Sequence, residues 1–174
     1  FADWANRGLN RWTIVQSTVT LSQGTVEYTL DADTIDILSA VIRENAGSTN
    51  QQDTTVNRIG RDTYLNLSSK LSQSKPTQYY IDRQITPKIR VFPSPNTTYT
   101  LVIDRLTRIE DADSASNTVD VPFRFYPCLA AGLAYYIAIK KAPDRIQILK
   151  SIYEEEFDRA ASEDRDRTSL KILP

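Results

Sequence analysis

Apolar and polar residues alternate through much of the first two thirds of the chain, a pattern typical of β-strands. In WTIVQSTVTL (12–21) most apolar residues share one parity, and the pattern returns in TVEYTL (25–30) after a turn that contains Gly24. These two runs predict a β-hairpin, and ILSAVIRE (37–44) predicts a third strand. The stretch Ala46–Thr55 predicts an exposed loop, because it is almost entirely polar.

Further β-elements are expected up to residue 109. VNRIGR (56–61) predicts a short strand, and Asp62 is a candidate N-cap for a helical turn. Three β-branched or aromatic runs, separated by turns with proline, predict strands at 77–84, Lys88–Phe92 and Tyr99–Ile109. Both parities of the last run mix apolar and charged residues, so the faces of that strand stay open. Short strands joined by turns indicate an antiparallel sheet or small sandwich.

The apolar spacing becomes helical near Pro127. In RFYPCLAAGLAYYIAIKKAP (124–143) apolar residues recur at helical intervals, and Pro143 ends the run. Its apolar part is little more than ten residues long, whereas a bilayer span needs about 20. We therefore expect a helix buried in a helical layer, with Leu133 inside it. An amphipathic helix over 144–165 follows at once, which predicts an antiparallel helix hairpin.

FADWANRG (1–8) predicts the end of another helix, since Phe1, Trp4 and Ala5 share one face and Gly8 can end it. We expect this helix end to pack against the hairpin. Because the chain contains no Met, we also expect it to be part of a longer gene product.

The predicted fold class is therefore α+β, with an antiparallel sheet or sandwich and a helical bundle. The β-rich region covers residues 12–109, and the bundle combines the N-terminal helix end with the hairpin at 122–167. A C-terminal tail covers 168–174. We expect these parts to form a single domain over 1–174.

Charge and composition remove several classes of function. Lys and Arg number 21 against 22 Asp and Glu, so there is no basic excess to hold nucleic acid by its phosphates. The chain has no His, which is the usual base of hydrolases and the commonest zinc ligand. Cys128 is alone, so no intrachain disulfide can form, and we expect it to be a small core residue. We predict no cofactor, no metal and no membrane span.

Acidic residues are the remaining candidates for catalysis or metal binding. Glu27, Asp31 and Glu110 qualify by residue type alone, and no spacing joins them into a pair. Glu154–Glu156 resembles a carboxylate cluster, but successive helical residues point in different directions, and Glu155 can pair with Arg159. We interpret these acids as a solvated surface and predict that the chain is not an enzyme.

The order of motifs resembles that of the head-to-tail adaptor proteins of tailed bacteriophages, of the type called tail tubular protein A in short-tailed phages. The resemblance covers nearly the whole chain and lies in the series rather than in any single motif. The segments that carry it are FADWANRGLNRWT, TVTLSQGTVEYTLDADTIDIL, RIGRDTYLNLSSK, KPTQYYIDRQITPKIRVFPSPNTTYTLVIDRLTRIEDA and VDVPFRFYPCLAAGLAYYIAIKKAPDRIQILKSIYEEEFDRAASEDR.

The resemblance implies a structural protein of the virion, assembled in the host cytoplasm and located at the phage neck. Family members form a homo-oligomeric ring, typically twelve-fold, between the portal protein and the tail nozzle or tube. DNA passes through the lumen without specific binding, and tail fibres are a further candidate partner. A near-neutral chain suits this role, because a channel for sliding DNA should not grip phosphates.

Two segments are candidate contacts in such an assembly. Apolar residues of the tail have no helical partner face to fill, and we expect them to contact the portal protein. These residues are Leu170, Ile172 and Leu173. The polar loop is longer than a connection needs, and we expect it to face the tail side or an adjacent subunit. Its candidate contact residues are Asn50, Gln51, Gln52 and Asp53.

Two other classes stay open at this point: a tail-associated binding module and a wall-degrading enzyme of a phage. A ring-forming adaptor differs from a monomeric module in its oligomeric state, and from an enzyme in lacking paired acids within a cleft.

Overall fold

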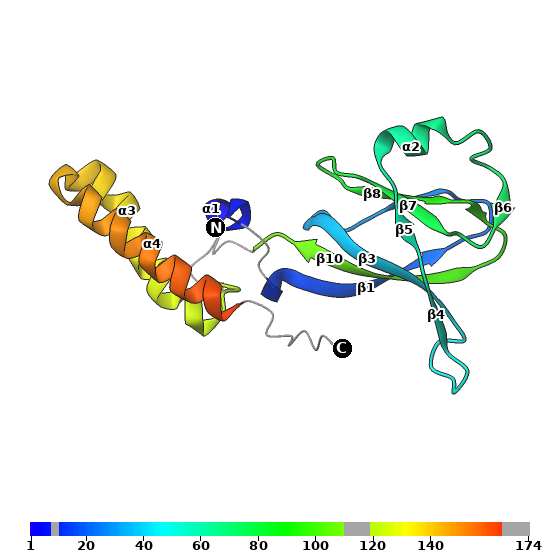
Figure 1. Ribbon diagram of the computed structural model, residues 1–174, viewed down its shortest axis with the longest axis horizontal. Helices are drawn as coiled ribbons and strands as arrows, with labels where there is room; N and C mark the ends of the chain where they lie inside the picture. Colours follow the sequence, from blue (N-terminus) through cyan, green and yellow to red (C-terminus); the bar gives the residue numbers. More distant parts are fainter. Residues whose placement is uncertain (8–10, 110–118, 165–174) are drawn as a thin grey trace, which may run out of the picture. The chain divides into compact units, whose positions relative to one another are not determined.

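The computed structural model describes residues 1–7, 11–109 and 119–164, and the chain divides into two compact units (Figure 1). The helical unit combines Phe1–Trp12 with Ile109–Pro174, and the β unit comprises Thr13–Arg108. The predicted α+β class, with antiparallel sheets and a C-terminal helix pair, is confirmed.

The β unit contains two four-stranded sheets. One has the order β1-β10-β3-β4 and is antiparallel throughout; the other has the order β2-β8-β7-β5, with β5 parallel to β7. The first sheet consists of β1 Ile14–Leu21, β10 Tyr99–Thr107, β3 Thr34–Glu44 and β4 Gln52–Thr55. The second consists of β2 Glu27–Thr29, β8 Lys88–Phe92, β7 Gln78–Asp82 and β5 Asn57–Arg58. The short helix α2 (Arg61–Asn66) and the two-residue pair β6 (Gln73–Ser74) and β9 (Ser94–Pro95) complete the unit.

Alternating apolar residues of both sheets form one core. On β10, Leu101 and Ile103 point into it beside Ile42 and Ala40 of β3, and the second sheet contributes Ile89 and other residues of β7 and β8. The sequence does not show which face of β10 is buried. In the structure both faces are buried near the middle of the strand, because Val102 is buried as well as Leu101 and Ile103. Val102 lies between Thr18 of β1 and Val41 of β3, whose side chains flank it on the same face of the sheet.

The predicted hairpin between residues 12–21 and 25–30 is wrong. β1 pairs with β10, and β2 pairs with β8 of the other sheet, so the intervening turn carries the chain from sheet to sheet. Gly24 has a positive φ of 76°, as the turn requires. The Tyr28 hydroxyl bonds to backbone groups of Ser22 and Thr25, which holds the crossover in place. Alternation and a glycine turn fit a hairpin and a sheet-switching corner equally well.

Two smaller predictions also need correction. The stretch Ala46–Thr55 is not all loop, because Gln52–Thr55 forms β4 and pairs with β3. Asp62 is not the N-cap of α2; that position is Gly60, and Asp62 lies in the first turn. A carboxylate in the first turn still favours the helix, because it interacts with the positive end of the helix dipole.

The helical unit contains α1 (Ala2–Asn6), α3 (Tyr126–Lys141) and α4 (Ile146–Glu163). Three short 3₁₀ turns lie at Arg11–Thr13, Phe123–Phe125 and Pro143–Arg145. The apolar face of α4 packs inward as its spacing predicts, with Tyr153, Phe157 and Ala160 buried. The predicted packing of Trp4 among the helices is confirmed, since it belongs to the same buried cluster. Gly8 and the segment 110–118 lie outside the described residues.

The prediction that Leu133 is buried is wrong. Leu133 is 56% exposed, and Tyr136 and Ile137 on the same side of α3 are 52% and 60% exposed. The buried residues of α3 are Cys128, Gly132 and Ala138. Apolar residues surround α3 on every side, so its periodicity cannot identify the face that packs against α4.

This exposure predicts a small effect for Leu133→Asp. The new carboxylate remains in water, so we expect the free energy of unfolding to change by less than about 1 kcal/mol. Urea unfolding followed by circular dichroism measures the change. A loss of several kcal/mol, as for a charge in a packed core, would contradict the exposed position.

Candidate interaction surfaces

The β3–β4 hairpin brings the polar candidate residues together. Asn50, Gln51, Gln52 and Asp53 are all exposed, as is every residue of β4. Figure 1 shows this hairpin extending away from the rest of the β unit. Asn45 and Gly47 adopt positive φ angles of 53° and 77°, which turn the chain between the two strands.

Internal bonds give the hairpin a defined shape. Arg43 binds Asp53 through two parallel hydrogen bonds of 2.9 and 2.7 Å, and these bonds lower the pKa of Asp53. Lys75 donates to Glu44 at 2.8 Å and to Thr54 at 2.9 Å at the base of the hairpin. The Gln51 side chain accepts a bond from the Gly47 amide at 3.1 Å. The hairpin therefore offers a partner an ordered polar surface.

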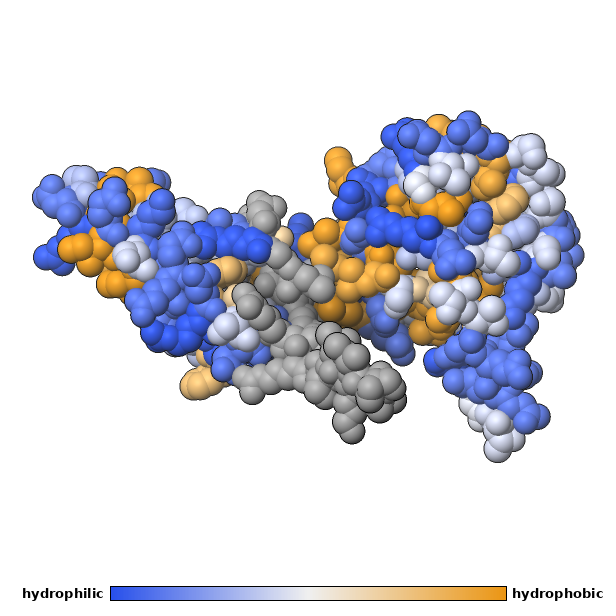
Figure 2. Space-filling view, in the orientation of Figure 1, coloured by the Kyte–Doolittle hydropathy of each residue, from blue (hydrophilic) through white to orange (hydrophobic). Residues whose placement is uncertain are grey.

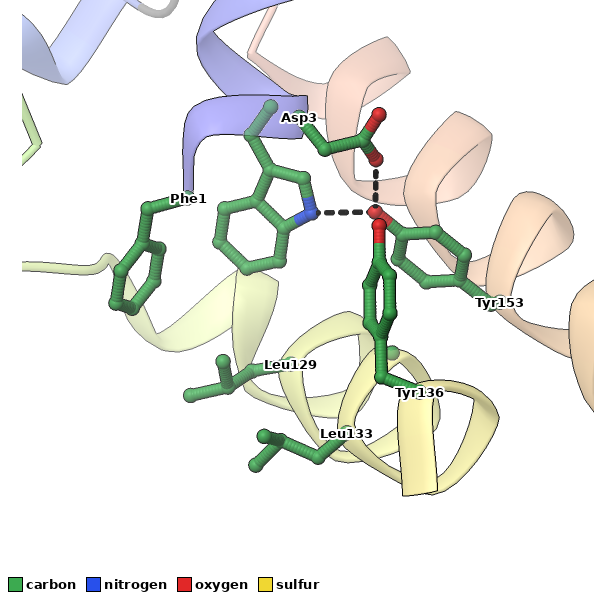
Figure 3. A pocket seen from close by; sticks show the side chains of 8 residues that line it. Phe1, Asp3, Leu129, Leu133, Tyr136 and Tyr153 are labelled. Atoms are coloured by element: carbon green, nitrogen blue, oxygen red, sulfur yellow. Dashed lines mark hydrogen bonds between the residues drawn. The ribbon is translucent and has the colours of Figure 1, made fainter. Parts of the chain in front are cut away.

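An apolar groove lies on the helical unit, where α1 covers α3 and α4 (Figure 3). Its volume is about 250 Å³. Lining residues are Phe1, Asp3, Trp4, Leu129, Gly132, Leu133, Tyr136 and Tyr153. The sequence alone does not reveal this groove. The feature of the sequence that could have indicated the groove is the number of apolar residues around α3. A helix needs only one apolar face to join a bundle, and α3 has apolar residues on other sides as well.

Tyr153 forms the polar part of the groove lining together with Asp3 and Trp4. Its hydroxyl accepts a 2.9 Å hydrogen bond from the Trp4 indole N–H and donates one of 2.6 Å to Asp3 (Figure 3). Burial raises the pKa of the Tyr153 phenol, and the bond to Asp3 adds to that effect. The phenol therefore stays neutral. The two hydrogen bonds position α1 and satisfy buried polar atoms. Because most of the lining residues are apolar, the groove suits an apolar side chain.

The acidic candidates form ion pairs with Lys and Arg side chains. Glu27 accepts bonds from Lys88 at 2.7 Å and Arg90 at 2.8 Å, which lower its pKa, and Asp31 lies 3.0 Å from Arg105. In α4, Glu155 and Glu156 pair with Arg159 at 3.1 and 2.9 Å, so the predicted interaction of Glu155 with Arg159 is confirmed.

The lowered pKa makes Glu27 a poor general acid, because that role requires a raised carboxyl pKa. Glu110 lies outside the described residues.

Cys128 is a buried core residue, as predicted. Burial raises the pKa of its thiol to about 12. The unfolded chain loses this proton near the ordinary thiol pKa of 9, so the fold loses stability as the pH rises from about 9 towards 12. We expect a falling urea midpoint across that range, and a smaller fall in Cys128→Ala. An identical pH profile for both proteins would contradict the assignment.

The described part of the chain contains no group of three or more His, Cys, Asp or Glu residues placed to hold a metal ion. None of its helices is both long and apolar enough to cross a membrane.

Comparison with known proteins gives one family. The family model described as SU10 adaptor protein matches residues 1–172. None of the curated proteins matches the chain. The family match includes the β3–β4 hairpin and the apolar groove, as well as Leu170 and Ile172 of the tail. Leu173 follows the matched range, and all three tail residues lie outside the described residues.

Proposed function

Since this chain belongs to the SU10 adaptor protein family and is a structural adaptor of a phage virion, we propose that it joins head to tail as one subunit of a ring. The match across 172 residues is the observation that carries the proposal, because it includes both compact units. The ring is typically twelve-fold in the family that the motif order resembles. It lies between the portal protein and the tail nozzle or tube, and DNA passes through its lumen without specific binding.

A genetic experiment tests this role. Stop codons in the gene should yield heads that package DNA but lack tails in electron micrographs, and the full chain supplied in trans should restore them. Normal tails on particles that lack the chain would overturn the proposal. A tail-associated binding module or a wall-degrading enzyme would instead leave tails attached and impair adsorption or host entry.

Within the ring, we assign the portal contact to Leu170, Ile172 and Leu173. Apolar side chains on a polar tail are unfavourable in water and stabilise an interface when a partner covers them. The ordered polar surface of the β3–β4 hairpin, with Asn50–Asp53, then faces the tail side or an adjacent subunit. Its exposed, hydrogen-bonded shape suits the polar rim of an interface.

Deleting Ser169–Pro174 tests the portal contact. We expect the melting temperature of the isolated chain to stay nearly unchanged, because the deletion begins after α4 has ended at Glu163. Attachment to portal-bearing heads should be lost in a sedimentation assay. As a matched control, Lys171→Ala keeps the three apolar residues and should attach normally. Full attachment of the truncated chain would show that the tail does not form the portal contact.

A further inference from the structure

The helix hairpin is electrically polarised along its length. We define the hairpin tip as residues 134–153 and the hairpin base as residues 124–133 with 154–164. The tip carries four cations and one carboxylate, and the base carries six carboxylates and two arginines. The cations of the tip are Lys140, Lys141, Arg145 and Lys150. All four are exposed, and within the described chain none of them has an ion-pair partner.

Helix stability does not account for this arrangement. A helix dipole favours anions at the N-terminus and cations at the C-terminus. In α4, however, Arg145 occupies the N-cap and Glu163 lies in the last turn, which contains no basic residue. The charges of α4 therefore run against its own dipole. Lys140 and Lys141 do follow the dipole of α3, so the unexplained part is the charge of α4.

Exposed apolar residues accompany the cations of the tip. Ile148 and Ile152 are 66% and 44% exposed and lie one turn apart on α4, and Ile139 of α3 is 46% exposed. Figure 2 shows hydrophobic and hydrophilic residues side by side at this end of the hairpin, on the left of the view. Phosphate backbones need cations alone, whereas apolar side chains ringed by cations fit a protein surface that is apolar and acidic.

The hairpin base has these complementary properties. Asp158 is exposed and has no ion-pair partner within the described chain. Glu155 beside it pairs with Arg159, but its side chain is still 72% exposed. The apolar groove with Leu129 and Leu133 begins on the same half of the hairpin. Contacts around a ring are heterologous, so every subunit must present two different and complementary patches. Tip and base are such a pair on one chain.

We propose that the hairpin tip of one copy packs against the hairpin base of the next, which makes these two surfaces the lateral contact of the assembly. This inference rests on the proposed function. It identifies the neighbour as a second copy of the same chain, through charge complementarity between four cations and a carboxylate-rich surface.

Cysteine cross-linking tests the contact in purified particles. Lys141→Cys and Asp158→Cys are combined on one chain and treated with a short bismaleimide. Cys128 is buried and protonated and serves as an unreactive background. We expect a ladder of multimers on a denaturing gel from the double variant, and no ladder from either single variant. If the particles contain many copies of the double variant but give no ladder, this inference is overturned and the proposed function is not. The same holds if the double variant cross-links to another protein. Particles without the chain overturn the proposed function and this inference with it.

Charge reversal supplies an independent test. Lys140→Glu with Lys141→Glu makes the tip acidic, and Glu155→Lys with Asp158→Lys makes the part of the base around Asp158 and Arg159 basic. Each variant alone should lose attachment to heads, and a mixture of the two should recover it, because opposite charges then alternate around the ring. Arg61→Glu with Arg108→Glu changes the net charge by the same amount as the tip variant, but on the β unit, and should attach normally. No recovery in the mixture, with both variants folded, would overturn the lateral contact.

Discussion

Trp4→Ala is expected to destabilise the helical unit by about 3–5 kcal/mol, the range for removing a large buried aromatic side chain. Trp4 is 3% exposed, and its ring lies 5.4 Å from that of Phe125 and 6.4 Å from that of Phe157, between ring centres. The substitution also removes the N–H that donates to Tyr153. Urea unfolding followed by far-UV circular dichroism measures the loss.

Trp4→Phe separates packing from hydrogen bonding. It keeps an aromatic ring in the cluster but removes the donor to the Tyr153 hydroxyl, which retains its bond to Asp3. We expect a smaller loss, with about 1–2 kcal/mol from the hydrogen bond. Equal stability of Trp4→Ala and the wild type would show that α1 does not contribute to the core of this unit.

Gly132→Leu is the second large change that we expect. A Cβ atom at Gly132 would lie 3.0 Å from the Tyr153 ring, so a leucine side chain would separate α3 from α4 or displace the ring. Overpacking of this kind costs about 1–3 kcal/mol, and displacing Tyr153 would also break its bonds to Trp4 and Asp3. We expect a lower melting temperature and a loss of protection from hydrogen exchange in α1.

Ala130→Leu is the matched control for this change. It places a leucine on the same helix, at an exposed position two residues away. Since alanine and leucine both favour helices, we expect its stability to stay within about 0.5 kcal/mol of the wild type. If Gly132→Leu were as stable as this control, the close approach of α3 to α4 would be wrong.

The sequence by itself predicts the kinds of element and their order. The β-branched runs become β3, β7, β8 and β10, since alternation with branched side chains suits a pleated sheet. Prolines near the ends of α3 confine it to Tyr126–Lys141, because proline fits a first turn and ends a preceding helix. The amphipathic face of α4 is readable for the same local reason: its polar and apolar sides differ.

Tertiary structure decides which surfaces meet. Strand pairing joins residues far apart in sequence, so a glycine turn cannot show that β1 lies beside β10 rather than β2. The buried face of α3 has no local signal, because apolar residues occupy all its sides. The position of Gly132 determines the buried face, because the absence of a side chain there lets the Tyr153 ring of α4 approach α3. That approach leaves Leu133, Tyr136 and Ile137 exposed, since a helix can direct only one side toward its partner.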